Sequence, residues 1–315
     1  MSAEPASSRN RATILGLIAI LLWATLALLA AATNGIPPFE TLSLSFAIAC
    51  ASGLAVVAAR GRLALLRQPV RAWALGFAGL FFYHGLYFTA IDNAPPAQAS
   101  LICYLWPLLI VLFAVLLPGG KLRPRHLVGA LLGLTGTALI LLGRGGALSG
   151  AGSPLGYASA FAAAFVWSGY SVTNRRVSAV PSDVIAGICG LVAIAGAITH
   201  FAVERTIVPD VVQALAIIGL GLGPVGLAFF VWDAATKHGD IALLGTLSYG
   251  APLFSTLLLI AAGMAPASVT ILGAAALIVG GAAISVGFSR RKADRRPSRQ
   301  PAARPDGHAP PRGMR

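Results

Sequence analysis

The sequence predicts an all-α integral membrane protein, with ten transmembrane helices in two inverted five-helix repeats and both termini in the cytoplasm. Three observations predict this fold. Of the 315 residues, 57% are hydrophobic and only 10% are charged. All but Arg144 and Arg205 of the 23 Lys and Arg residues fall in alternate gaps between long apolar stretches, or in the two tails. Aromatic and proline residues also recur at one nearly constant offset along the chain.

The composition excludes an ordinary soluble domain. Such a domain carries roughly 25% charged residues, and a mean hydropathy of +0.81 has no explanation in a soluble protein. A net charge of +13 is also typical of nucleic-acid-binding proteins. Here, however, the basic residues stand in short loops beside apolar spans, as in membrane proteins. We therefore expect membrane lipid as a partner and no nucleic acid.

The apolar stretches have the length of membrane spans, which need about 20 mostly apolar residues. The first stretch follows Arg9 and Arg11 and so resembles a signal peptide. Its roughly 19 apolar residues exceed the usual 7–15 of a signal sequence, so we expect a helix that stays in the protein. The expected helices cover residues 13–33, 39–59, 72–92, 95–117, 125–143, 154–174, 183–203, 210–232, 239–262 and 267–288.

The positions of the charges orient these helices. Basic residues follow the second, fourth, sixth and eighth expected helices and flank both ends of the chain, with Lys237 after the eighth helix. Cytoplasmic loops of membrane proteins carry this excess of Lys and Arg. The other gaps, with almost no positive charge, hold Glu40, Asp92, Glu204 and Asp210. We expect them to face outward, and the Arg- and Pro-rich residues 290–315 to form a disordered cytoplasmic tail.

The two halves of the chain repeat each other. The matching pairs are Trp23 with Trp167, Pro37 with Pro181, Tyr104 with Tyr249 and Pro107 with Pro252. A repeat of five helices must insert the second time with the opposite orientation. Many secondary transporters are built in this way, with a site between the halves near the membrane midplane. The expected units are a cytoplasmic segment 1–12, a first repeat 13–144, a second repeat 145–289 and the tail 290–315.

Three residues of the helix 72–92 are the first candidates for a binding site. Tyr83 and Tyr87 are four positions apart and share a helix face, and His84 lies close to that face. His84 is also near mid-depth, where an ionisable side chain is costly and marks a functional site by default. The alternative is a neutral His84 that is hydrogen-bonded to a neighbouring helix.

Polar and aromatic residues share faces on two other helices. On one helix the stripe is Trp167, Tyr170, Ser171 and Asn174, and on the other it is Thr246, Tyr249 and Thr256, with Ser248 beside it. Hydroxyl groups in a membrane must face protein or water. These stripes therefore line a cavity or, alternatively, form hydrogen bonds between helices. Trp23 and Trp232 have the further alternative of being interfacial anchors.

Pro107 and Pro252 fall inside the fourth and ninth expected helices. A proline removes a backbone hydrogen bond and kinks a helix, and freed carbonyl groups are tolerated where they line a cavity. We expect both prolines to shape the cavity and act as hinges, with a purely structural bend as the alternative. Trp106 lies about 200° from Tyr104 on an ideal helix. Both therefore face one cavity only if Pro107 distorts the turn.

Small residues recur on the fifth and tenth expected helices and permit close helix packing. They are Gly129, Gly133, Gly136, Gly273, Gly280 and Gly287. We expect them to pack within the monomer in preference to forming a dimer seam.

The expected helices carry no acidic or basic residue near mid-depth. Proton or sodium coupling usually shows a buried carboxylate, so His84 is the only evident proton carrier. The lack of a Lys or Arg clamp disfavours a phosphorylated cargo. A neutral or zwitterionic solute with an apolar part remains. None of Cys50, Cys103 and Cys189 has a partner at ligand spacing, so we expect neither a metal nor another cofactor.

Ten helices in inverted halves, paired Tyr-x-x-Pro motifs within helices and cytoplasmic ends resemble the drug/metabolite transporter superfamily, in its EamA-type branch, over residues 13–288. The cluster of Tyr83, His84 and Tyr87, together with Trp106 and Trp167, is similar to the aromatic amino acid exporters of that branch. The resemblance implies a bacterial inner-membrane exporter that works by alternating access. It also implies a central cavity between helices 1, 3, 4, 6, 8 and 9, with helices 5 and 10 at the periphery.

We therefore expect a transporter, and not an enzyme, that exports aromatic and other apolar amino acids by uncoupled facilitated diffusion. The expected substrate-binding residues are Tyr83, His84, Tyr87, Tyr104, Trp106, Trp167, Ser248 and Tyr249. An exporter of drugs or other neutral metabolites stays open as an alternative. A remote alternative is an intramembrane enzyme with Ser248 as nucleophile and His84 as base. A channel would need a polar path that this chain lacks.

Overall fold

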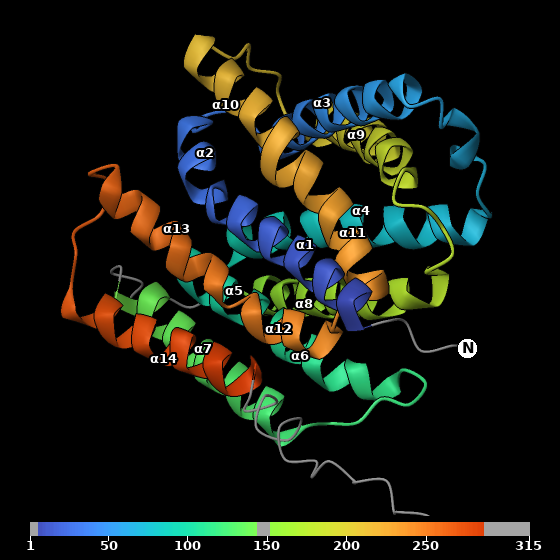
Figure 1. Ribbon diagram of the computed structural model, residues 1–315. Helices are drawn as coiled ribbons and strands as arrows, with labels where there is room; N and C mark the ends of the chain where they lie inside the picture. The colour runs from blue at the N-terminus through green and yellow to red at the C-terminus, as the bar shows by residue number, and fades with distance from the viewer. Residues whose placement is uncertain (1–5, 144–151, 287–315) are drawn as a thin grey trace, which may run out of the picture.

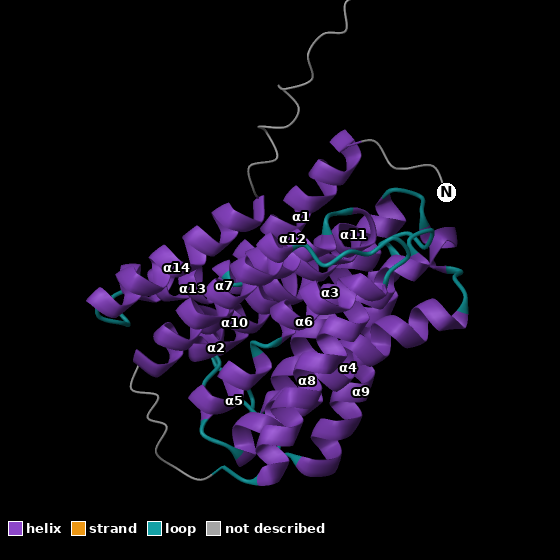
Figure 2. Cartoon of the chain, turned by 90° about the horizontal axis from the view of Figure 1, so that it is seen from below, coloured by secondary structure: helices purple, strands orange, loops and turns teal. Residues whose placement is uncertain are grey.

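The structure is a computed structural model that describes residues 6–143 and 152–286, and every regular element in these ranges is a helix (Figure 1, Figure 2). The expected tail 290–315 lies outside the described residues. The first elements are α1 (Ala6–Ala24), α2 (Leu26–Ala32), α3 (Pro38–Ala59), η1 (Leu63–Leu66), α4 (Val70–Asn93), α5 (Pro96–Cys103), α6 (Trp106–Phe113), η2 (Ala114–Leu116) and α7 (Pro124–Gly143). The others are α8 (Pro154–Thr173), η3 (Asn174–Val177), α9 (Val184–Val203), α10 (Val211–Leu222), η4 (Gly223–Leu227), α11 (Ala228–His238), α12 (Ile241–Leu247), α13 (Gly250–Ala261) and α14 (Val269–Val286).

Nine segments of the described chain are long and apolar enough to cross a membrane. Four of them are interrupted, because the pairs α1 and α2, α5 and α6, α10 and α11, and α12 and α13 each form one span. The expected helix 154–174 forms as α8, with 20 residues, but does not belong to the nine. Its many Ala, Ser and Gly residues lower its hydropathy, although Phe161 and Phe165 on it are exposed as lipid-facing side chains would be.

Two expected boundaries are wrong. α1 begins at Ala6, so part of the segment 1–12 is helical; the sequence has no Gly or Pro between Ala6 and Thr13 that would stop it. α11 continues to His238, and Gly239 follows it, so Lys237 lies within a helix and not in a connection. An ion pair of 2.7 Å with Asp233, one turn earlier, holds Lys237 there.

Four long helix pairs dominate the packing. α4 packs along α8, α1 along α11, α3 along α9 and α7 along α14 (Figure 1). α7 and α14 meet backbone to backbone, because a Cβ atom built on Gly129 would lie 2.5 Å from the carbonyl oxygen of Gly281. The glycines of α7 therefore pack within the chain. By contrast, Gly273 and Gly280 of α14 have no neighbour within 4 Å of such a Cβ atom, and Gly287 lies outside the described residues.

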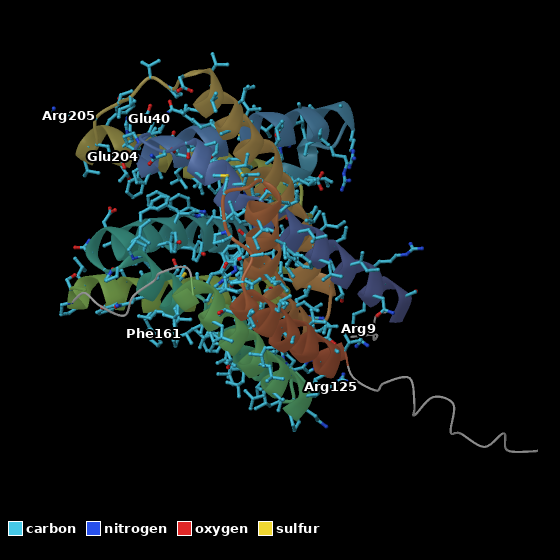
Figure 3. The ribbon with its side chains drawn as sticks, turned by 90° about the vertical axis from the view of Figure 1, so that its left-hand side faces the viewer. Arg9, Glu40, Arg125, Phe161, Glu204 and Arg205 are labelled. Carbon is cyan, nitrogen blue, oxygen red and sulfur yellow. The ribbon has the colours of Figure 1, made fainter. Side chains whose placement is uncertain are left out.

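Charged residues separate to opposite ends of the bundle. Arg9 and Arg125 lie at one end, and Glu40, Glu204 and Arg205 at the other (Figure 3). We call the first, which also carries Arg62 and the connection after α11, the basic end. We call the second, which carries the connections 33–37 and 204–210, the acidic end.

Each end is tied by contacts between distant segments. At the acidic end the Glu204 carboxylate accepts hydrogen bonds from the backbone N–H groups of Phe39 and Glu40, at 3.0 and 3.2 Å. These N–H groups belong to the first turn of α3, where a negative charge is stabilising. At the basic end Arg62 pairs with Asp183 at 2.9 Å. Both contacts join the first half of the chain to the second.

Candidate binding cavity

A cavity of about 580 Å³ lies at the centre of the bundle. Its walls come from α1 to α6, α8, α10, η4, α11 and α13. The cavity extends to the acidic end, where Asn34, Gly35 and Ile36 line it. Among the described residues, its lining includes no Asp, Glu, Lys or Arg and no residue of a basic-end connection. It is therefore an uncharged space that is open toward one end only.

Indole rings close the cavity toward the basic end. The ring of Trp23 lies 6.2 Å from that of Trp106, 5.7 Å from that of Trp167 and 5.0 Å from that of Trp232. Trp167 and Trp232 are stacked, with centroids 6.3 Å apart. Trp232 does not line the cavity and lies behind the other three, because α11 runs from Phe229, in the wall, to His238 at the basic end. We call these four tryptophans the aromatic floor.

The reading of Trp23 and Trp232 as interfacial anchors is wrong. Trp232 is fully buried, and its indole N–H donates to the Ser171 hydroxyl at 3.2 Å. The indole N–H of Trp23 donates to the carbonyl oxygen of Pro224 at 3.1 Å. Pro224 belongs to η4, a π-helical turn between α10 and α11, and such turns are frequent at functional sites.

Chain breaks bring other predicted residues to the cavity. α5 ends at Cys103 and α6 begins at Trp106, so the chain turns at Tyr104 and Leu105. Because of this break, Tyr104 and Trp106 both line the cavity. On a regular helix they would face different sides, so the sequence predicted a shared cavity only if the turn was distorted. Pro107 stands in the first turn of α6, where its missing N–H group costs no helical hydrogen bond.

The second half has the matching break. α12 ends at Leu247 and α13 begins at Gly250, with Pro252 in the first turn of α13. The break falls at Ser248 and Tyr249, but neither residue lines the cavity. The Ser248 hydroxyl donates to the Leu244 carbonyl at 2.7 Å.

Tyr249 faces away from the cavity. Its ring is fully buried between α13 and α7, against Gly133 and in a cluster with Leu253 and Ile278. A residue of α7 as small as Gly133 leaves the space that the ring fills. A substrate contact by Tyr249 or Ser248, or a dyad of Ser248 with His84, does not fit these positions.

The aromatic residues predicted on α4 line one wall of the cavity. Tyr83 and Tyr87 are stacked with centroids 6.3 Å apart, and the ring of Tyr83 lies 5.2 Å from that of Trp167. The hydroxyl groups of Tyr87 and Ser100 are 3.3 Å apart, which links α4 to α5. Six of the eight predicted binding residues are thus brought together, and the other two are not.

His84 has a defined hydrogen-bonding role. Its Nδ1 atom lies 2.7 Å from the carbonyl oxygen of Leu80, on the same helix and not on a neighbouring one. A carbonyl oxygen only accepts, so Nδ1 carries a proton and the Nε2 atom of a neutral ring is an acceptor. The ring packs edge-on against Phe46 and Phe229, at 5.4 and 6.1 Å. His84 thus adds a polar atom to an otherwise aromatic wall.

Several lining residues were missed in the sequence. Trp23 could have been found, because it matches Trp167 in the repeat. Phe46, Phe88 and Phe229 carried no signal, since a phenylalanine in an apolar helix faces lipid as readily as a cavity. Lys237 was expected after the eighth helix, but Lys237 and Asp233 are both buried in α11 beside the aromatic floor.

The comparisons with known proteins agree on one family. A family model described as the EamA-like transporter family matches residues 10–142. The aromatic amino acid exporter YddG of Ancylobacter novellus is 50% identical over 286 residues, which are 90% of this chain and 100% of that protein. The protein of the same name from Escherichia coli is 28% identical over 300 residues, 90% of this chain and 99% of the relative. A crystal structure of a chain 49% identical matches with a TM-score of 0.86, over 90% of this chain and 99% of the other.

Proposed function

Because the chain belongs to the EamA-like transporter family, we propose that it exports aromatic and other apolar amino acids across the bacterial inner membrane by alternating access. It is a multi-pass membrane transporter and not an enzyme. The observation that carries the choice of cargo is the ring-lined cavity, whose lining within residues 6–143 and 152–286 includes no Asp, Glu, Lys or Arg. Relatives that match nearly the whole chain and carry the name aromatic amino acid exporter support the same choice.

We also propose ten transmembrane helices in two inverted repeats, with α8 as the tenth. The packing supports this arrangement. In the two repeats α1 corresponds to α8, α3 to α9, α4 to α11 and α7 to α14. If each helix is replaced by its counterpart, the pair α4 and α8 becomes the pair α11 and α1. The pairs α3 with α9 and α7 with α14 each consist of two counterparts and stay the same. These are the four main helix pairs. Two inverted copies around a twofold axis produce this pattern.

The basic end faces the cytoplasm in this proposal, and the acidic end faces outward. The positive-inside rule supports this orientation, since Arg9 and Arg125 lie at one end and Glu40 and Glu204 at the other (Figure 3). The cavity extends to the acidic end only. The described conformation is then the outward-facing one, in which an exported amino acid would leave.

The cavity offers the groups that a zwitterion with an aromatic side chain needs. Each ring contact is worth about 0.5–1.5 kcal/mol, and an ammonium group over a desolvated ring about 2 kcal/mol. The Nε2 atom of His84 would accept a hydrogen bond from the ammonium group. Since a zwitterion has no net charge, the membrane potential does no net work on it, against ~2.3 kcal/mol per charge for each 100 mV.

Counterflow in liposomes that contain the purified protein tests the proposal. We expect vesicles loaded with phenylalanine to take up radiolabelled phenylalanine, and unlabelled tryptophan to compete. Failure of every amino acid to compete would point to another neutral metabolite as cargo. We also expect the same flux with and without a proton gradient, because the described residues that line the cavity include no carboxylate. A several-fold rise with the gradient that is lost in His84→Ala would contradict uncoupled diffusion.

A further inference from the structure

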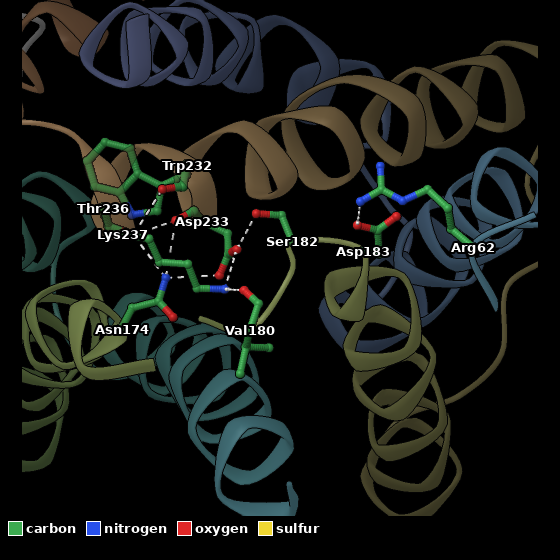
Figure 4. Close-up of polar contacts among 9 residues, drawn as sticks. All are labelled: Arg62, Asn174, Val180, Ser182, Asp183, Trp232, Asp233, Thr236 and Lys237. Carbon is green, nitrogen blue, oxygen red and sulfur yellow. Dashed lines mark hydrogen bonds and ion pairs between the residues drawn. The ribbon is translucent and has the colours of Figure 1, made fainter. Parts of the chain in front are cut away.

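A buried ion pair lies on α11, directly after Trp232 of the aromatic floor (Figure 4). The Nζ atom of Lys237 is 2.7 Å from the Oδ2 atom of Asp233, one turn away on α11. The two residues are only 3% and 1% exposed. Trp232, the deepest ring of the floor, directly precedes Asp233. The pair therefore occupies the route from the cavity toward the basic end.

Hydrogen bonds join this pair to another part of the chain. The Asn174 amide donates to Asp233 Oδ1 at 2.9 Å, and the Ser182 hydroxyl donates to Asp233 Oδ2 at 2.6 Å. Lys237 donates to the carbonyl oxygen of Val180 at 2.9 Å. Asn174 begins η3, and the other two residues lie in the connection from η3 to α9. The contacts thus tie the end of α11 to the segment 174–182.

The repeat gives an independent reason to see a closed gate here. Ala30 is the counterpart of Asn174 in the first repeat, because each follows its matching tryptophan, Trp23 or Trp167, at the same spacing. Phe88 is likewise the counterpart of Asp233, because each precedes its matching tyrosine, Tyr104 or Tyr249, at the same spacing. Ala30 and Phe88 both line the open cavity. Equivalent positions therefore line the open cavity in the first repeat and are joined by a hydrogen bond in the second.

We propose that the cluster of Asp233, Lys237, Asn174 and Ser182 is the inner gate of the transporter, and that the contacts of the charged pair to Asn174, Ser182 and Val180 break and re-form in each cycle. The inference rests on the proposed function in that it assumes alternating access. Because Asp233 and Lys237 share one helix, they stay paired when α11 separates from the segment 174–182. Opening therefore exposes a neutralised pair to water and never leaves a lone buried charge, which would be strongly unfavourable.

The composition of the gate fits repeated opening. Replacement of a buried ion pair by apolar residues is often neutral or stabilising, so a permanent clamp has no need of charges. Polar groups, in contrast, exchange their protein partners for water at little net loss when they separate. The equivalent positions of the first repeat, Ala30 and Phe88, have no such groups. The two gates thus differ in chemistry although their helices match.

Cysteine labelling tests the gate without any substrate. In a background where Cys50, Cys103 and Cys189 are replaced by Ala, single cysteines at three positions report on three places. Val184→Cys, beside Lys237 and only 2% exposed, reports on the gate. Ala30→Cys reports on the outer cavity, and Ile140→Cys, in the remote contact of α7 with α14, reports on general loosening. A membrane-impermeant maleimide is applied to inside-out vesicles for Val184→Cys. It is applied to right-side-out vesicles for Ala30→Cys and Ile140→Cys, because Ile140 is near the end of α7 opposite to Arg125.

We expect Asn174→Ala and Ser182→Ala each to raise the labelling rate of Val184→Cys about fivefold, and the double variant to raise it further. Ser182→Ala removes the hydrogen bond to Asp233, and Asn174→Ala removes the hydrogen bonds of its amide to Asp233 and Thr236. The rates of Ile140→Cys should stay unchanged, and those of Ala30→Cys unchanged or lower. Ser182→Thr keeps the hydroxyl and should label as slowly as the parent. Arg62→Ala, which breaks the exposed ion pair with Asp183 next to the gate, is the matched control and should have no effect.

An unchanged Val184→Cys rate in the double variant would overturn the gate. A rise shared by Ile140→Cys would do the same, because it would indicate a merely structural role. Both outcomes are independent of the cargo. If phenylalanine counterflow succeeds but the labelling does not change, the proposed function is supported and the gate is contradicted. If the labelling changes but no counterflow occurs, the gate is supported and the proposed cargo is contradicted.

Discussion

The indole N–H of Trp23 donates a hydrogen bond to the carbonyl oxygen of Pro224, 3.1 Å away, and so joins the break between α1 and α2 to the π-helical turn between α10 and α11. Both residues line the cavity. Two interrupted spans from different halves of the chain thus meet at one bond, beside the place where cargo would bind.

Trp23→Phe should destabilise the protein while keeping an aromatic ring in the floor. Loss of one hydrogen bond costs about 1 kcal/mol, and the Pro224 carbonyl oxygen loses its partner. We expect a lower midpoint of thermal unfolding in detergent and slower phenylalanine counterflow. An unchanged midpoint would mean that water replaces the indole at no cost.

Trp106→Leu, which removes the aromatic ring, should weaken binding of aromatic cargo more than that of aliphatic cargo. The indole of Trp106 lines the cavity and lies edge-on to those of Trp23 and Trp167. A ring contact is worth about 0.5–1.5 kcal/mol, so the half-saturation concentration for tryptophan should rise roughly two- to tenfold. The same variant should change leucine transport little. Equal losses for tryptophan and leucine in counterflow would instead indicate a defect in the transport cycle.

His84→Leu should lower the affinity for amino acids, and His84→Gln should lower it less. The prediction follows from the Nε2 acceptor, since a hydrogen bond to a charged group is worth about 1.5–3 kcal/mol. We expect at least a tenfold weaker half-saturation for phenylalanine in the Leu variant. Equal behaviour of the two variants would show that His84 only fills space between Phe46 and Phe229.

Gly129→Ala should destabilise the contact between α7 and α14. Its Cβ atom would lie 2.1 Å from the Ser285 hydroxyl oxygen and 2.5 Å from the Gly281 carbonyl oxygen. Overpacking of this kind costs about 1–3 kcal/mol, so the unfolding midpoint should fall. Gly280→Ala on α14 is the matched control, because its Cβ atom meets nothing within 4 Å and Ala favours a helix by up to ~1 kcal/mol. A fall of equal size in both variants would contradict close packing at Gly129.

The aromatic wall on α4 could be predicted because side chains four apart share a helix face whatever the rest of the fold does. This rule predicted that Tyr83 and Tyr87 share a face with His84 close to it, and all three line the cavity. Charge counting likewise separated the two ends, as Arg9 and Glu40 illustrate.

Positions next to a break in a helix could not be predicted in this way. The chain leaves the helical path at Tyr104 and again at Tyr249, and a helical wheel does not hold across such a turn. The first tyrosine consequently reaches the cavity while the second faces Gly133. Lys237 was misplaced for another reason: its burial together with Asp233 is accompanied by hydrogen bonds to Asn174, Val180 and Ser182, which are distant in sequence.

The meeting of Gly129 with Gly281 has a mechanical consequence. Where these two glycines meet, no side chain stands between the backbones that could adopt another rotamer and ease sliding. We therefore expect the last helix of each half to stay fixed to its counterpart. The remaining helices would then swing about that axis.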